Sequence, residues 1–369
     1  MADKQQPVIL VGGHWSPAQA VAEKLVDQGK QIYFIGRRYS SSQGKTDSWE
    51  YSECQRLGYD FLPLDSARFH RHSWWQTWRE LPRFFRACYR SWQYLRQLKP
   101  VAVVSFGGYL SLPVGLAAKL MGIRLIIHEQ TATAGLANRV LARLADKVAI
   151  SFPSSQAFFP QDKLVFVGNP VRSQLLNSAV PKKFHQHTHP TILVMGGNQG
   201  FARLNRLMLE ALPDWCQKYR LVHSFGRHPE QQPLYQAAVS LAKDCRSYQP
   251  FLFLDAQQLA KQLRQADLVI SRAGANTCYE LALLNQPAIL IPLEKTGQTG
   301  EQQANANWLQ QLGLVEVLSE SQLSVKQLER LIDQMLANLP SYRLSRKQQE
   351  KYFPQDAAAA LAQLVLKND

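Results

Sequence analysis

Residues 268–307 read LVISRAGANTCYELALLNQPAILIPLEKTGQTGEQQANAN and alternate apolar runs with loops of small and polar residues. Residues 268–271 and 288–292 are apolar runs of the length expected for buried parallel strands. After the first run, Thr277 is expected to open a helix, with Glu280 three residues later. After the second run, a loop over residues 294–300 leads into another helical pattern. Two successive strand–loop–helix units predict a parallel sheet covered by helices.

The loops of these two units are predicted to form a binding site. In an open parallel sheet they emerge at the carboxyl ends of the strands, where ligands bind. The helices that follow would direct N–H groups of their first turns at one crevice, which favours a diphosphate. Gly274 lies in the first loop, and Glu280, Gln302 and Asn305 are expected to bond hydroxyl and amide groups of the ligand. An alternative for Glu280 is a capping box with Thr277, which needs no ligand.

Residues 268–307 resemble the donor site of the MurG family. Four further segments carry the resemblance in the family's order: FGGYLSLPVGLAAKLMGIRLIIHEQ (106–130), GLANRVLARLADKV (135–148), VGNPVR (167–172) and GGNQG (196–200). The similarity runs from about residue 8 to about residue 320. Members of this family add N-acetylglucosamine (GlcNAc) from UDP-GlcNAc to lipid I, the polyprenyl-pyrophosphoryl-MurNAc-peptide of peptidoglycan synthesis. The resemblance therefore implies an inverting glycosyltransferase.

The resemblance and the two similar α/β halves predict an α/β fold of two doubly wound, Rossmann-like domains with an interdomain cleft, the GT-B arrangement. Residues 1–177 are expected to form an acceptor and membrane-binding domain, 178–190 a linker, and 191–353 a UDP-GlcNAc-binding domain. A last helix over about 354–369 is expected to pack back on the first domain, as in the family.

Composition sets limits on the function. The net charge is +14, of which residues 1–175 carry 22 Lys/Arg against 12 Asp/Glu. A basic half implies an anionic partner such as nucleic acid, anionic lipid or a pyrophosphate. The five cysteines have no CxxC spacing, which indicates reduced thiols. The sequence shows no signal peptide and no apolar run long enough to span a membrane.

The first glycine-rich loop holds the candidate base. Residues 8–11 are a predicted strand that runs into Gly12-Gly13-His14, and Ser16 and Pro17 are expected to open the helix. The matching loop of the family reads GGTGGH, so only its final GGH is present here. By the resemblance, His14 is the candidate catalytic base, and Gly13 and His14 also belong to the UDP-GlcNAc site.

Polar residues at other strand ends complete the predicted site. Glu129 is the second candidate base, with a purely loop-orienting role as the alternative. Thr131 stands where the family has Asn, and Asn198 where it has Ser; Arg172 matches an arginine near the donor diphosphate. The predicted acceptor-binding residues are Gly107, Gly108, Tyr109, His128 and Gln130, and the donor set adds Thr131, Arg172 and Asn198.

Residues 68–99 contain eight Arg/Lys against one acid, interleaved with nine aromatic residues. We expect two short helices, because Pro82 should break a single one. Seven residues form a stripe at helical spacing, and about half of them are expected to face the core: Trp74, Trp78, Leu81, Phe85, Cys88, Trp92 and Leu95. Off that stripe, Trp75, Phe84, Tyr89 and Tyr94 lie among arginines, as suits an anionic bilayer. The family has a basic and apolar membrane patch in this region, which predicts peripheral binding to the cytoplasmic face of the plasma membrane.

The predicted reaction needs no metal and no cofactor, and no DxD-type metal motif is present. The developing charge on the leaving diphosphate would be stabilised by helix N-termini and Arg172. One alternative is a UDP-GlcNAc 2-epimerase on the same fold, against which the basic aromatic segment speaks. Another is a non-catalytic nucleotide-sugar-binding membrane protein. A nucleic-acid binder would explain the charge but not five motifs in order.

Overall fold

The computed structural model describes residues 6–39, 47–67, 74–176, 189–294 and 300–367, without the side chains of residues 74–78. Two compact units divide the chain: Met1–Val171 with Asp356–Asp369, and Arg172–Gln355. The division falls six residues before the expected end of the first domain, because helix α6 (Ser173–Leu176) packs on α9 (Ala256–Gln265) of the second unit. Most of the expected linker lies outside the described residues.

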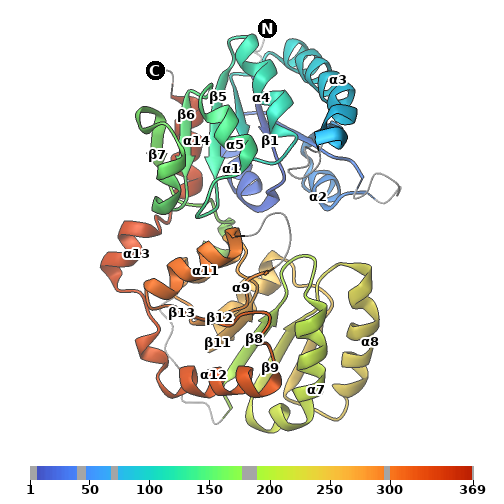
Figure 1. Cartoon of the computed structure of the whole chain (residues 1–369), viewed down its shortest axis with the longest axis vertical. Coiled ribbons are helices and arrows are strands. Elements are labelled where there is room, and N and C mark those ends of the chain that lie inside the picture. Colours follow the sequence, from blue (N-terminus) through green and yellow to red (C-terminus); the bar gives the residue numbers. More distant parts are fainter. Residues whose placement is uncertain (1–5, 40–46, 68–73, 177–188, 295–299, 368–369) are drawn as a thin grey trace. The chain divides into compact units, whose positions relative to one another are not determined.

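The first unit is a seven-stranded parallel sheet with the order β3-β2-β1-β4-β5-β6-β7. Its helices cover the sheet on both faces (Figure 1). The strands are β1 Val8–Val11, β2 Ile32–Gly36, β3 Asp60–Pro63, β4 Ala102–Ser105, β5 Arg124–Glu129, β6 Lys147–Ile150 and β7 Leu164–Phe166. The helices are α1 Trp15–Asp27, α2 Trp49–Leu57, α3 Trp74–Leu98, α4 Ser111–Leu120, α5 Leu136–Ala142 and α14 Ala357–Leu366, with 3-10 turns η1 Pro153–Phe158 and η2 Gln161–Lys163.

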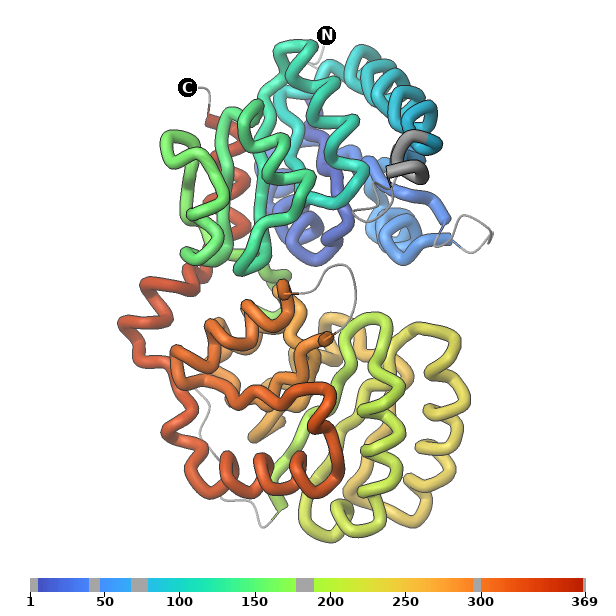
Figure 2. The backbone as a smooth tube through the Cα atoms, viewed as in Figure 1, coloured from blue at the N-terminus to red at the C-terminus, as the bar shows by residue number. Residues whose placement is uncertain are grey.

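The last helix of the chain belongs to the first unit. Helix α14 packs on α1, and Leu361, Ala362 and Val365 join the cluster that Val8, Leu10 and Val21 build on that face of the sheet. Figure 2 shows the red C-terminal helix returning beside the blue N-terminal segment. An alanine-rich apolar helix can lie this close to α1 because its side chains are small.

The second unit is a six-stranded parallel sheet with the order β10-β9-β8-β11-β12-β13. Its strands are β8 Thr191–Met195, β9 Arg220–Ser224, β10 Tyr248–Phe251, β11 Leu268–Ser271, β12 Ala288–Leu290 and β13 Val315–Val317. Besides α6 and α9, its helices are α7 Ala202–Lys218, α8 Gln232–Leu241, α10 Ala275–Leu283, α11 Glu301–Gln311, α12 Val325–Ala337 and α13 Arg346–Tyr352, with 3-10 turns η3 Pro229–Gln231 and η4 Leu339–Ser341.

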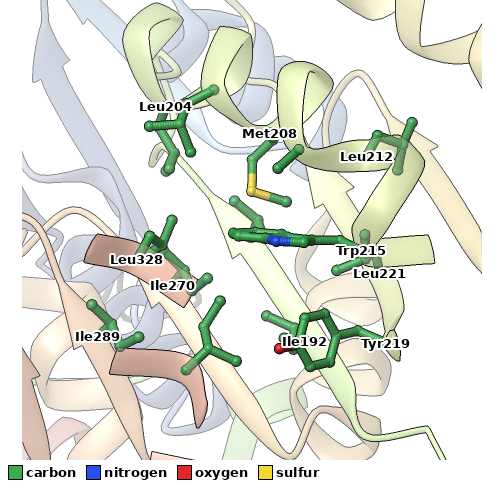
Figure 3. Close-up of a cluster of buried hydrophobic side chains, with 14 of the residues drawn as sticks. Ile192, Leu204, Met208, Leu212, Trp215, Tyr219, Leu221, Ile270, Ile289 and Leu328 are labelled. Carbon is green, nitrogen blue, oxygen red and sulfur yellow. The ribbon is translucent and has the colours of Figure 1, made fainter. Parts of the chain in front are cut away.

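The core of the second unit is built where α7 and α12 cover the sheet. Trp215 and Met208 of α7 lie over Ile192 and Ile270 of the central strands, and Leu328 of α12 closes the cluster (Figure 3). Trp215 is fully buried, and burying a side chain of this size contributes about 3 kcal/mol. The central strands β8 and β11, which lead into the loops of the site, are thus packed against α7 and α12.

Helix α3 differs from its prediction in two ways. It is one helix of 25 residues with Pro82 inside it, so the expected break is absent. Within the stripe, Leu95 is buried while Phe85 is 65% and Trp92 36% exposed, so only part of it faces the core, as expected. Tyr94, expected on the lipid-facing side, is instead buried. The buried face uses Ala87, Ser91, Tyr94 and Leu95. Helix α3 packs on α4, and Ala87 and Leu95 lie in the same buried cluster as Val114 and Ala118 of α4. The Tyr94 hydroxyl donates to Pro63 O at 2.9 Å.

Two helices begin earlier than predicted. Helix α1 starts at Trp15 with His14 at the N-cap, and α10 starts at Ala275 with Gly274 at the N-cap. The His14 side chain does not bond the first turn of α1, and Gly274 has no side chain with which to bond that of α10. The preference for Ser or Thr at the N-cap, on which the predicted helix starts are based, therefore fails at both sites. Glu280 consequently lies in the second turn of α10, and the capping box with Thr277 is wrong.

In the part of the chain that the structure describes, no helix is long and apolar enough to cross a membrane. Among those same residues, no group of three or more His, Cys, Asp or Glu is arranged to hold a metal ion.

Candidate active site

Each unit has one point at which its strand order reverses. In the first unit this point lies between β1 and β4, which pair in parallel with Val11 opposite Ser105. In the second it lies between β8 and β11, with Met195 opposite Ser271. Ligands of doubly wound sheets bind at the carboxyl ends of such strands. The predicted glycine-rich turns therefore follow the strands that form both switch points.

The turns after β1 and β4 pack backbone against backbone. A Cβ on Gly12, where φ is +136°, would lie 2.6 Å from Gly107 O, which excludes any side chain. A Cβ on Gly108 would lie 3.3 Å from Gly13 N. This close approach brings the predicted residues Gly13, His14, Gly107, Gly108 and Tyr109 together at one edge of the sheet.

His14 holds the N-cap position of α1 without bonding the helix. Burial lowers the pKa of its imidazole to about 4, so the ring is neutral near pH 7. A neutral imidazole has a lone pair that can accept a proton from a substrate hydroxyl.

His128, at the end of β5, is fully buried below this edge. Its Nε2 lies 3.1 Å from both Gly168 O and Ser151 Oγ. Burial lowers the pKa of His128 to about 4, although its hydrogen bond with Gly168 O counteracts part of that shift. Gln130 is buried as well, and its amide donates to Phe106 O at 3.4 Å, just before the Gly107 turn. The His128 ring also packs near the Phe106 ring, with 5.6 Å between centroids, so both residues contact the segment that leads into the Gly107 turn.

Glu129 is surrounded by hydrogen-bond donors. Oε1 accepts from the Thr131 amide at 3.1 Å and the Thr131 hydroxyl at 2.7 Å. Oε2 accepts from the Gly135 amide and from Asn138 Nδ2, both at 3.0 Å. The carboxylate is 1% exposed. The structure therefore places Thr131 and Glu129 in one internal network, the loop-orienting role that the sequence left open.

In the second unit, the turn after β8 lies against the loop after β9. A Cβ on Gly196 would lie 2.3 Å from Phe201 N, and one on Gly200 would lie 2.1 Å from Phe225 O. Asn198 is exposed at the tip of this turn, and its carbonyl accepts from Arg227 N at 2.9 Å. Helix α7 begins immediately after the turn, without a side-chain cap.

Glu280 and Arg172 face each other beside the N-terminus of α10. Arg172 Nη2 lies 3.9 Å from Glu280 Oε1, and both side chains are largely buried. Burial raises the pKa of Glu280, and the charge of Arg172 counteracts part of that rise. The structure thus brings together two predicted donor residues that are far apart in sequence.

Gln302 and Asn305 connect α11 to the loops before it. Leu293 N donates to Gln302 Oε1 at 3.1 Å, and Asn305 Nδ2 donates to Ala273 O at 3.2 Å, beside Gly274. Asn305 is 1% exposed. These bonds hold the loops after β11 and β12 in a fixed relation to α11.

Sequence reasoning missed two arginines at the same edge. The Arg272 guanidinium lies 3.3 Å from the centre of the Phe201 ring and bonds Glu320 Oε2 at 2.8 Å. The Arg227 guanidinium lies 3.7 Å from the centre of the Phe253 ring. Arg272 lies in the RAGAN turn, so the sequence could have indicated its place at this edge. Its contact with the Phe201 ring could not be predicted from the sequence.

Comparison with known proteins identifies the family. Residues 11–150 match the glycosyltransferase family 28 N-terminal domain, and residues 191–361 match its C-terminal domain. A protein of Listeria monocytogenes named UDP-N-acetylglucosamine--N-acetylmuramyl-(pentapeptide) pyrophosphoryl-undecaprenol N-acetylglucosamine transferase is 33% identical over 96% of both chains. The chain belongs to the MurG family of glycosyltransferases.

Solved structures agree with this family. The crystal structure of MurG from Acinetobacter baumannii is 27% identical, covers 98% of this chain and 100% of its own, and has a TM-score of 0.72. The predicted α/β class with two Rossmann-like domains, of the GT-B type, is confirmed. A UDP-GlcNAc 2-epimerase from Neisseria meningitidis has a TM-score of 0.64 over 98% of this chain and 99% of its own, but at 14% identity it shares the fold alone.

Proposed function

We propose that this chain transfers GlcNAc from UDP-GlcNAc to the 4-hydroxyl of the muramyl sugar of lipid I, giving lipid II for peptidoglycan synthesis. The proposal is carried by one observation. Both halves of the chain match a glycosyltransferase family over most of their length, and the family's motif residues lie at the switch point of each sheet.

His14 is the proposed catalytic base. It sits where the β1 and β4 turns meet, and its imidazole is neutral at physiological pH. As the acceptor hydroxyl attacks the anomeric carbon, its proton passes to the imidazole and UDP leaves with the bonding electrons. Gly107, Gly108 and Tyr109 are the proposed acceptor contacts. His128 and Gln130 act from below, by fixing the conformation of these turns.

Glu129 is assigned a positioning role rather than that of a base. Both oxygens of its carboxylate are already engaged by four hydrogen bonds from residues 131–138. It orients the segment from Thr131 to Asn138, which lies against Gly107. The Thr131 hydroxyl takes part by bonding Glu129.

The donor is proposed to bind in the second domain. The first turns of α7 and α10 present amide groups to the diphosphate, and Arg172 adds a positive charge. Glu280 accepts hydrogen bonds from the ribose hydroxyls. Asn198 contacts a phosphate oxygen, while Gln302 and Asn305 hold the loop around the sugar.

The membrane surface is proposed to lie on the outer face of α3. Phe85 and Tyr89 are 65% and 61% exposed, and Arg86 and Arg90 are exposed beside them. A mixture of exposed aromatic and basic side chains fits anionic lipid at the cytoplasmic face of the plasma membrane, where lipid I is presented.

One assay tests the proposal and separates its rivals. The purified protein is incubated with UDP-GlcNAc and a lipid I analogue, and the products are identified by mass spectrometry. Formation of UDP and a GlcNAc-extended acceptor is expected. Conversion of UDP-GlcNAc to its 2-epimer without acceptor would favour the epimerase instead. Nucleotide binding without any turnover would favour a non-catalytic binding protein.

A further inference from the structure

A buried polar network lies beneath the glycine-rich turn of the second domain, among residues that the proposed mechanism does not use. His223 of β9 and Asn205 of α7 are 0% exposed, and Gln231 of η3 is 3% exposed. The His223 ring packs on the Phe225 ring with 4.0 Å between centroids. Buried polar side chains in such a position need a full set of partners, because each unpaired group costs roughly 1–3 kcal/mol.

The donor and acceptor of each hydrogen bond in this network can be assigned in one consistent way. Asn205 Nδ2 donates to Gln231 Oε1 at 2.7 Å and to Phe225 O at 3.1 Å, which uses both of its hydrogens. Asn205 Oδ1 lies 3.0 Å from His223 Nε2 and must therefore accept from it. His223 Nδ1 is left without a hydrogen and accepts from the Tyr248 hydroxyl at 3.0 Å. Burial lowers the pKa of His223 to about 3, so the ring is neutral and carries its single hydrogen on Nε2.

The network touches the turn directly. Phe225 O, which accepts from Asn205, is also the atom that a Cβ on Gly200 would meet at 2.1 Å. The Gln231 side chain lies on the other side, since the same Cβ would meet its Cγ at 2.8 Å. Gly226 packs on Gly200 as closely. Gly200 has φ of +87°, a region that glycine adopts readily, and the contacts with Phe225, Gln231 and Gly226 leave no room for a side chain there.

We propose that Tyr248, His223, Asn205 and Gln231 form a positioning network that sets the turn over residues 196–200 for a nucleoside diphosphate. The network fixes Gly200 and Phe225, and through them the exposed residues Gly197 and Asn198 and the first turn of α7. The inference rests on the proposed donor site. A disturbed network should weaken diphosphate binding and raise the KM for UDP-GlcNAc more than it lowers kcat, because the reacting groups of the first domain are untouched.

The test compares variants of one side chain. His223→Phe keeps the ring but loses both hydrogen bonds, whereas His223→Gln keeps an amide donor for Asn205. Calorimetric titration with UDP, well below the unfolding temperature, should show about tenfold weaker binding for His223→Phe and a loss within about threefold for His223→Gln. Gln231→Met, which removes the acceptor for Asn205, should also weaken UDP binding and serves if His223→Phe does not fold.

Tyr219→Phe is the matched control. It removes a hydrogen bond of 2.8 Å to Asp333 at the amino end of β9, so it lowers stability without reaching the turn. UDP affinity and KM should be those of the wild type. Equal UDP affinity in wild type, His223→Phe and Gln231→Met would overturn the inference, as would equal losses in His223→Phe and His223→Gln.

A failure of this inference can be distinguished from a failure of the proposed donor site. If wild-type protein does not bind UDP, the proposed function fails first. The network is then tested by the nitrogen chemical shifts of the His223 ring in labelled protein. A hydrogen on Nε2 is expected, and a ring protonated on Nδ1 would overturn the network.

Discussion

Arg172 Nη2 lies 3.9 Å from Glu280 Oε1, and the two side chains are only 13% and 8% exposed. This distance brings the charges together but is too long for a hydrogen bond. Within the described residues, Arg172 Nε is buried and has no hydrogen-bond partner. The guanidinium and the carboxylate can therefore still form hydrogen bonds with a ligand that carries hydroxyl and anionic groups.

Replacing Glu280 with Ala should weaken UDP-GlcNAc binding by roughly 1.5–3 kcal/mol, because charge-assisted bonds to the ribose are lost. Stability should fall as well, since Arg172 remains as a buried charge without its counterpart. Calorimetric titration of the folded variant measures the affinity separately from the stability. Undiminished affinity would show that Glu280 serves only to neutralise Arg172.

The ionisation of Glu280 beside Arg172 should also make the free energy of unfolding depend on pH. The pKa of Glu280 is raised in the folded state above its ordinary 4.5, so the folded protein binds a proton more tightly than the unfolded chain. The free energy of unfolding should therefore decrease as pH rises from 4.5 through the raised pKa. Glu280→Gln should abolish this part of the pH dependence in denaturant titrations. An identical slope in both proteins would contradict the raised pKa.

Replacing His14 with Ala should lower kcat by roughly 10²–10⁴ while UDP binding stays intact. With the imidazole pKa lowered to about 4, the activity of the wild type should persist on acidification and decline only as pH approaches that value. For comparison, Glu129→Ala should mainly lower stability, because four donors lose their acceptor. High residual activity in His14→Ala would transfer the role of base to another group.

The sequence predicts what is local in this site and misses what folding assembles. Glycine turns after apolar runs mark both switch points, because such turns and strands are decided by neighbouring residues. The four hydrogen bonds to Glu129 could not be predicted in the same way. One of them comes from Asn138 on helix α5, and only the folded structure brings that side chain to the carboxylate. Helix α10 begins two residues before Thr277, with Gly274 as its N-cap. A glycine N-cap makes no side-chain hydrogen bond, so the sequence pattern does not indicate it. The pairing of Arg172 with Glu280 depends wholly on tertiary structure.

The buried face of α3 was only partly predictable for a related reason. Large apolar side chains at helical spacing normally mark a core, but here the buried positions include the small residues Ala87 and Ser91. Phe85 and Trp92 are left at the surface. The side chains of Trp74, Trp75 and Trp78, and all of Arg68 and Arg71, lie outside the described residues, so their predicted roles remain predictions.

The exposed face of α3 leads to a membrane prediction that differs from one based on sequence alone. Arg83 donates to Asp65 at 2.8 Å and to Glu80 at 3.1 Å, so its charge is already compensated. Arg86, Arg90 and Arg96 are exposed, and Arg96 lies 5.1 Å from the centre of the Trp92 ring. Each basic residue near an anionic leaflet contributes about 1 kcal/mol, so changing these three to Ser should weaken vesicle binding by about 3 kcal/mol, roughly a hundredfold.

Co-sedimentation with vesicles of neutral or anionic lipid measures this effect. Wild-type protein should bind anionic vesicles in a salt-dependent manner, because exposed charges are screened within a Debye length of about 10 Å at 0.1 M salt. A change of Phe85 and Tyr89 to Ser should remove the part of binding that resists salt. The matched control replaces Lys243, Arg246 and Arg264 of the second domain with Ser, which removes the same charge from exposed positions elsewhere. Turnover of a soluble, short-chain acceptor should be the same in all of these variants. Equal losses in the control and in the α3 variant would show that net charge, and not the α3 face, recruits the protein to lipid.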